Sequence, residues 1–157
     1  MISESKLHDK DKVWVFQSSR TFDPNLQSQI LSTIADFTKD WQTHGKALQS
    51  GAQILYNHFI VIWIEEAFQS ASGCSVDRMM SFFQKLGEQH HLDLFNRTTL
   101  AFIEKDKVFF YKLSEAKRKV KQKAFSENVL FFNNSISSGK QFHQNWKINP
   151  YQSWLNR

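Results

Sequence analysis

The order of the expected elements predicts an α+β fold. Strand and helix patterns alternate as β-α-β-β-α-β between residues 13 and 104, and a β-α-β unit and a polar tail follow. The first six elements match a ferredoxin-like split βαβ sandwich, in which two helices cover one face of a sheet. The right-handed crossover rule supports this topology. We therefore expect a ferredoxin-like sandwich with a C-terminal β-α-β extension and a wrapping tail.

The first helix is predicted from its capped start and its apolar stripe. It follows an aromatic, β-branched strand at residues 13–18, and Asp23 with Pro24 is typical of an N-cap and a first helical residue. Gly45, directly after His44, is expected to end the helix as its C′ residue. The stripe recurs every three or four residues at Leu26, Ile30, Ile34, Phe37 and Trp41.

The next two strands are expected at residues 48–56 and 58–65, with Asn57 in the turn between them. Residues 59–64 are apolar at every position, so this strand should be central and covered on both faces. A second helix is expected at residues 75–90. Its inward positions are Val76, Met79, Met80, Phe83 and Leu86.

The rest of the chain predicts a hairpin, a basic helix, a short strand and a tail. The hairpin pairs residues 98–104 with 107–112, the helix covers 114–125, and the last strand covers 129–133. We expect a loose lead-in at residues 1–12, one domain at residues 13–133, and a tail at residues 134–157 that packs on the domain. The tail's apolar anchors are Trp146, Pro150, Tyr151 and Trp154.

The composition indicates an ordered core and excludes several classes of protein. The chain is 41% apolar and 15% aromatic, which argues against disorder. One cysteine excludes an internal disulfide and a Cys-rich zinc site. No apolar run approaches the ~18 residues of a membrane span, and the amino terminus lacks an apolar signal core. We expect a cytoplasmic protein with no metal or cofactor and no membrane partner.

The net charge of +5 is concentrated in one predicted helix. Six cations and one acid lie between residues 112 and 123, so this segment carries the whole excess. Such a distribution argues against a generally basic surface and against nucleic acid as the main partner. An RNA-associated module using Lys117, Arg118, Lys121 and Phe125 is the alternative to a solvated helix face.

The start of the second helix is the strongest candidate for a binding site. Free backbone N–H groups and the positive end of the helix dipole meet there, which favours an anion. Arg97, at the start of a later strand, either contributes a cation or pairs with Asp93. The residues expected to bind the anion are Ser72, Gly73, Ser75 and Arg97.

The same helix start also suggests thiol chemistry. A helix N-terminus can activate a thiol, so Cys74 could act as nucleophile, with His44 as base and Asp77 orienting it. The simpler explanations are a buried Cys74 that packs the turn, and His44 and Asp77 that complement the helix dipoles. In a split βαβ sandwich, the end of the first helix meets the start of the second. We therefore expect His44 within hydrogen-bonding reach of Cys74 or Asp77.

Residues 41–45, 72–77 and 93–97 resemble a family of small, uncharacterised bacterial proteins. Residues 131–134 and the tail from Trp146 to Trp154 extend the resemblance over most of the chain. Members of this family often carry the label "ABC transporter ATPase". The resemblance implies membership of the family and no mechanism.

The sequence contradicts an ATPase activity. A P-loop needs two glycines that let backbone N–H groups hold the phosphates, followed by lysine and a magnesium-binding hydroxyl. Residues 137–141 lack the first glycine and place Gln141 where the hydroxyl belongs. We therefore expect no P-loop ATPase. The leading hypothesis is a domain that binds a small anion or a protein partner, and the alternatives are a thiol-dependent acyl-transfer enzyme or hydrolase and an RNA-associated module.

Overall fold

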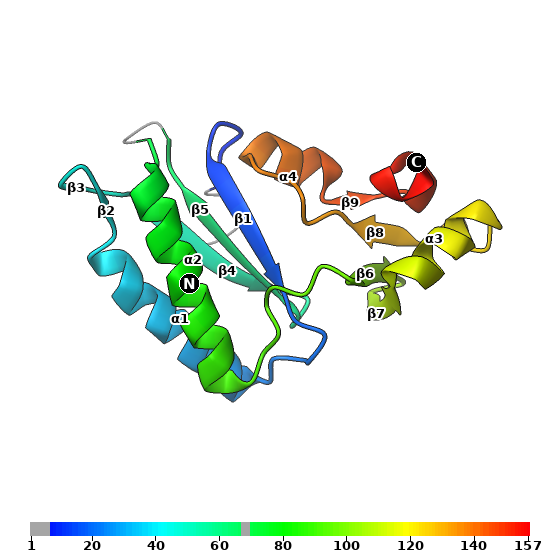
Figure 1. The fold of residues 1–157 in the computed structure, drawn as a ribbon, viewed down its shortest axis with the longest axis horizontal. Helices are drawn as coiled ribbons and strands as arrows, with labels where there is room; N and C mark the ends of the chain where they lie inside the picture. Colours follow the sequence, from blue (N-terminus) through cyan, green and yellow to red (C-terminus); the bar gives the residue numbers. More distant parts are fainter. Residues whose placement is uncertain (1–6, 67–69) are drawn as a thin grey trace.

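The first sheet carries the two long helices. In the computed structural model, which describes residues 7–66 and 70–157, this antiparallel sheet has the order β1-β5-β4. Both helices lie on one of its faces (Figure 1). The bounds are β1 (Lys12–Gln17), α1 (Pro24–Lys39), β4 (Ser50–Leu55), β5 (Phe59–Ile64) and α2 (Gly73–His90).

The second sheet is built from the C-terminal part of the chain and has the order β7-β6-β8-β9. Helix α3 covers one of its faces, and the short helix α4 contacts β1 (Figure 1). The bounds are β6 (Thr99–Glu104), β7 (Lys107–Lys112), α3 (Leu113–Lys121), β8 (Leu130–Phe132), α4 (Gly139–Asn145) and β9 (Lys147–Ile148), followed by the 3₁₀ turns η2 (Pro150–Gln152) and η3 (Trp154–Asn156).

The predicted α+β class is confirmed, but within residues 7–66 and 70–157 the first sheet has three strands and no fourth, ferredoxin-like strand. Strand β6 lies between β7 and β8 in the second sheet instead of beside β1. A fourth ferredoxin strand would sit at a sheet edge, whereas both edges of β6 are paired here and residues 100–103 are all buried. Among the described residues, the backbone of the outer edge of β1 is paired at one end only, by residues 137–139.

Three apolar clusters hold the layers together. One lies between the first sheet and the helices, one between the two sheets, and one between the second sheet and α3. All six residues of β5 are buried, which confirms the prediction of a central strand covered on both faces. In the part of the chain that the structure describes, no helix has the length and apolarity needed to cross a membrane.

The predicted end of the first helix is wrong. Asp23 and Pro24 begin α1 as expected, but the helix ends at Lys39. Strands β2 (Gln42–Thr43) and β3 (Lys46–Ala47) then form a small hairpin. His44 and Gly45 occupy its turn with φ of 50° and 76°, and a pair of positive φ values is what a tight hairpin turn requires. The glycine therefore serves a turn and not a helix C-cap.

The segment before β1 packs against the start of α4. Residues 1–6 of the expected lead-in lie outside the described residues. From Leu7 on, the chain is held: Leu7 is buried, Gly139 N–H donates to the Asp11 carbonyl at 2.9 Å, and Lys140 N–H donates to the Asp9 carbonyl at 3.0 Å. These bonds connect the beginning of the described chain to its C-terminal part.

Candidate functional site

The start of α2 is closed by its own capping interactions. Ser72 is the N-cap, its Oγ accepts from the Ser75 N–H at 3.2 Å, and the Ser75 Oγ accepts from the Ser72 N–H at 2.9 Å. This reciprocal capping box satisfies donors that an anion would otherwise use. Gly73 and Cys74 are exposed, so the explanation of Cys74 as buried packing is wrong.

The start of α2 does lie beside the β2–β3 hairpin, and the contact is made by Trp41, which directly precedes β2. The indole N–H of buried Trp41 donates to the Ser75 carbonyl at 2.9 Å. His44 and Asp77 are both exposed. Among the described residues, no hydrogen bond joins either of them to Cys74, and no group of three or more His, Cys, Asp or Glu is arranged to hold a metal ion. The catalytic roles of these three residues stay predictions.

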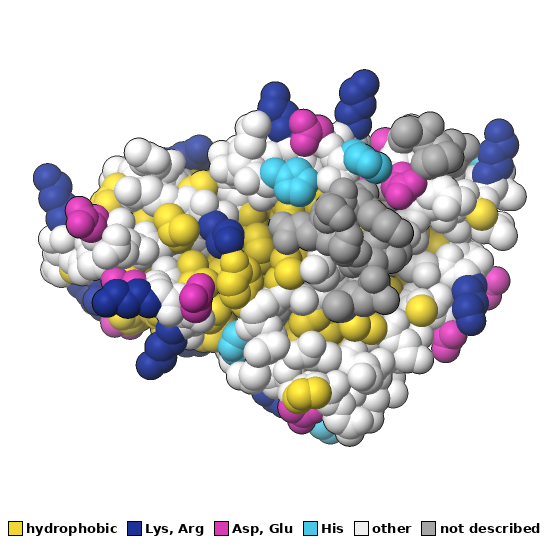
Figure 2. All heavy atoms as spheres, turned by 180° about the vertical axis from the view of Figure 1, so that it is seen from behind, with side chains coloured by type: hydrophobic (Ala, Val, Ile, Leu, Met, Phe, Trp, Pro, Cys, Tyr) yellow, Lys and Arg dark blue, Asp and Glu magenta, His cyan; other side chains and the backbone are white. Residues whose placement is uncertain are grey.

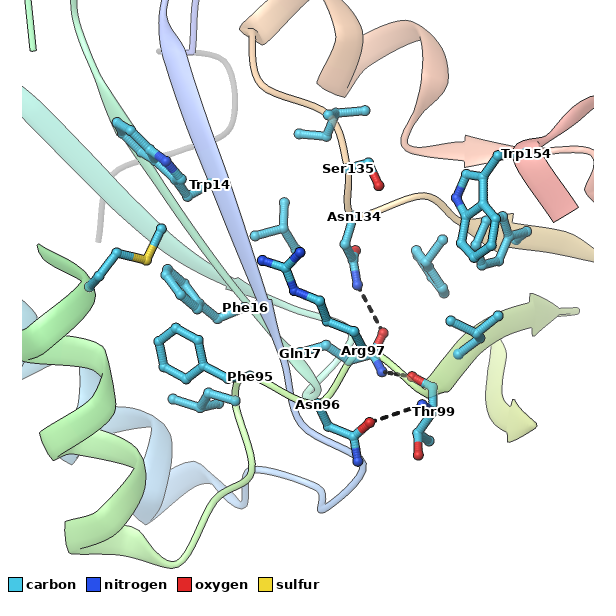
Figure 3. Close-up of a pocket in the computed structure, with 17 residues that line it drawn as sticks. Trp14, Phe16, Gln17, Phe95, Asn96, Arg97, Thr99, Asn134, Ser135 and Trp154 are labelled. Atoms are coloured by element: carbon cyan, nitrogen blue, oxygen red, sulfur yellow. Dashed lines mark hydrogen bonds between the residues drawn. The ribbon is translucent and has the colours of Figure 1, made fainter. Parts of the chain in front are cut away.

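A larger site lies elsewhere, along the outer edge of β1 (Figure 3). A cavity of about 550 Å³ opens there, between the first sheet, the α2–β6 loop and the segment that follows β8. We call it the interstrand cavity. Its volume falls in the range of roughly 300–1,000 Å³ that is typical of small-molecule sites. It occupies the side of β1 where a fourth ferredoxin strand would pair.

The walls of the interstrand cavity are apolar on two opposite sides. The helix side is formed by Trp14, Phe16, Met80, Leu94 and Phe95. The side of the second sheet is formed by Leu100, Phe131, Phe132, Ile136 and Trp154. Most of these side chains are buried in the clusters that hold the layers together, so the walls are set by the core of the fold.

A few polar groups converge at the mouth of the cavity. Gln17 is central, because its Nε2 donates to the Thr99 carbonyl and its Oε1 accepts from Asn134 Nδ2, both at 2.9 Å. Asn134 is oriented in turn by the Trp146 indole, which donates to its Oδ1 at 2.9 Å. Asn96 Oδ1 accepts from the Thr99 N–H at 3.0 Å (Figure 3). This network fixes the amides that border the opening.

Arg97 is the one charged residue among the described residues that line the cavity. Figure 3 shows its side chain extended across the mouth toward β1. The alternative pairing with Asp93 is not formed: that carboxylate accepts from Asn96 Nδ2 at 3.1 Å, and no ion pair to Arg97 occurs within the described residues. A guanidinium with five donors is thus left beside an apolar cavity that contains no acid.

The basic helix α3 has a different environment. Lys117, Arg118 and Lys121 are exposed, whereas the Lys119 ammonium lies 4.8 Å from the centre of the Tyr111 ring. The face of the molecule opposite to the view of Figure 1 carries cations and acids interspersed around exposed apolar side chains (Figure 2). The exposed cations of α3 form a local basic stripe.

Comparisons of the chain with models of protein families, with curated proteins and with solved structures find no match. Function therefore has to be inferred from the geometry of the site.

Of the predicted site residues, the structure places only Arg97 in the interstrand cavity, and Ser72, Gly73, Ser75, Cys74, His44 and Asp77 lie outside it. Sequence reasoning missed Gln17 and Asn134, which meet although 117 positions separate them. The available signal was their position: each is a polar residue at or just after the end of an apolar strand.

Proposed function

We propose that this protein binds a small organic anion with an apolar body in the interstrand cavity. The observation that carries the proposal is the single guanidinium at the mouth of an otherwise uncharged, aromatic-walled cavity. Binding sites for small molecules commonly combine apolar walls with a few fixed polar groups. Arg97 would hold the anionic group by charge-assisted hydrogen bonds, and the apolar body would lie between the aromatic walls.

The proposal keeps the ligand class expected from the sequence and moves its site. At the start of α2, the capping box occupies the Ser72 and Ser75 hydroxyls, and that segment does not line the cavity. The interstrand cavity offers both volume and a cation. A cytoplasmic location belongs to the same proposal, because an exposed, unpaired thiol suits a reducing compartment.

The test is a titration of the purified protein with 4-phenylbutyrate, octanoate and their uncharged amides. Saturable binding of at least one carboxylate is expected, with the matched amide about tenfold weaker, because a charge-assisted bond at an exposed arginine contributes about 1.4 kcal/mol. Arg97→Gln should weaken carboxylate binding about tenfold and leave amide binding unchanged. Isothermal calorimetry measures both.

The matched control is Arg78→Gln, which removes an exposed arginine from α2 outside the cavity. It should leave the affinity for the carboxylate within about twofold, since distant surface charges are screened. Absence of carboxylate binding at millimolar concentration would refute the proposal. Equal effects of the two arginine substitutions would also refute it, because binding would then follow net charge.

A further inference from the structure

The outer edge of β1 presents backbone groups that nothing else in the described chain pairs with. Val13 N–H donates outward to the Ser137 carbonyl at 3.1 Å, which fixes the direction of the odd-numbered residues. Because backbone direction alternates along a strand, Trp14 and Phe16 pair with β5, and Val15 points its N–H and C=O away from the sheet. No backbone bond from Val15 to another segment is formed among the described residues.

The unpaired part of this edge is short, because other segments of the chain bind β1 on either side of it. At the Lys12 end, Ser137 and Gly139 pair with the backbone of residues 11–13. At the other end, Asn134 Nδ2 donates to the Gln17 side chain. Between these two closures, the edge at Val15 borders the interstrand cavity, and Val15 is among its lining residues.

The cavity also has the side-chain pattern that an added strand requires. Successive side chains of an extended peptide point to opposite faces, so a strand beside β1 needs one apolar pocket on each side. The helix side supplies Met80, Leu94 and Phe95, and the opposite side supplies Phe132 and Ile136. Arg97 contributes the one charged side chain of the lining, and its positive charge complements a carboxylate on the ligand.

We infer that the ligand of the interstrand cavity is a short extended peptide with a terminal carboxylate, which pairs its backbone with Val15. This inference rests on the proposed function and narrows its ligand class. Main-chain bonds to Val15 supply sequence-independent affinity, alternate apolar side chains enter the two pockets, and the carboxylate binds Arg97. Non-peptide carboxylates fill the same volume but leave the Val15 groups without a partner.

The test uses mixtures of N-acetylated tetrapeptides, randomised at all four positions, with either a free carboxylate or an amide at the C-terminus. Peptides retained by the purified protein are identified by mass spectrometry and titrated singly. Retention of carboxylate peptides with alternate apolar side chains is expected, with the amide forms about tenfold weaker. Hydrogen exchange of the Val15 amide, measured by NMR, should be fast in the free protein and slowed at least tenfold by the bound peptide.

Val15→Pro is the decisive variant, because it removes the outward N–H without removing a bond to β5. It should weaken the binding of the peptide about tenfold more than it weakens the binding of 4-phenylbutyrate, whereas Val15→Thr, which keeps the N–H, should show no such difference between the two ligands. If Val15→Pro does not fold, the exchange of Val15 in the unaltered protein decides the matter. Binding of 4-phenylbutyrate without any peptide, or peptide binding without protection of Val15, overturns the peptide inference alone. Binding of neither overturns the proposed function as well.

Discussion

Replacing Gly51 with alanine should destabilise the protein, because the Trp63 indole packs directly over the glycine. Gly51 lies opposite Trp63 in the β4–β5 ladder, and both residues are buried. A Cβ at position 51 would lie 2.5 Å from Cε2 and 2.9 Å from Nε1 of the indole, closer than real Cβ contacts. Trp63 is 1% exposed, so its ring has no free space into which it could move.

The expected magnitude follows from the rigidity of this contact. Overpacking a well-packed core costs about 1–3 kcal/mol, and an indole must move as one unit, so we expect a loss near the upper value. In a protein of about this size, each kcal/mol lowers the melting temperature by about 2–4 °C, which gives a decrease of about 6–12 °C.

Gly73→Ala is the matched control, with the opposite expected sign. A Cβ at Gly73 meets nothing within 4 Å, and the residue lies in the first turn of α2 with an ordinary backbone conformation. Alanine there should raise the free energy of unfolding by about 0.4–1 kcal/mol, because it restricts the unfolded chain. Urea and thermal denaturation followed by circular dichroism measure both variants. A Gly51→Ala protein within about 0.5 kcal/mol of the unaltered one would refute the packing argument.

The remaining predictions concern one hydrogen bond, one thiol, the basic helix α3 and the absence of ATP hydrolysis. Trp41→Phe removes the buried indole donor and should cost about 1–2 kcal/mol in urea denaturation; no change would mean that the bond to α2 contributes nothing. Cys74 should react with iodoacetamide in the folded protein, and labelling only after denaturation would contradict its exposure. If α3 binds RNA, retention should fall steeply with salt and vanish when Lys117 and Lys121 are changed to glutamate; salt-insensitive or absent retention removes that alternative. Purified protein should not hydrolyse ATP, and turnover that is lost on Lys140→Ala would contradict the absence of a P-loop.

Local patterns predicted most helices and strands, because their signals lie within each segment. The N-cap at Asp23 and the stripe of α1 depend only on neighbours in sequence, and so does the alternation of two apolar faces in β5. The turn at Gly45 shows where such signals fail. A glycine with positive φ suits both a helix C-cap and a hairpin turn, and burial of Trp41 and Thr43 decides between them.

The placement of β6 could not be predicted, because strand pairing is a long-range choice. Residues 99–104 have the apolar pattern of a buried strand in either sheet. The choice follows from partners outside the β-α-β-β-α-β unit: β7 and β8 cover both edges of β6. Both partners follow β6 in the sequence, so the pattern of the first six elements does not contain them.

The interstrand cavity was hidden for the same reason. The cavity exists because β6 belongs to the second sheet and does not pair with the edge of β1. At its mouth, a hydrogen bond connects Gln17 to Asn134, which are far apart in the sequence. Arg97 could be selected from sequence as a cation near a strand start, but nothing in its neighbourhood shows that aromatic walls surround it. The candidate at the helix start was visible because most of its residues lie within the short segment 72–77.

The two closures on β1 also bear on self-association. An exposed strand edge is a template on which another copy of the chain can add a strand, and proteins that leave long edges open tend to aggregate. Here Ser137 occupies one end of the edge, and the Gln17–Asn134 bond occupies the other. A second β1 would need the full edge from Lys12 to Gln17, while the open part centres on Val15 alone. The edge is thus wide enough for a short segment and too short to propagate a sheet from one molecule to the next.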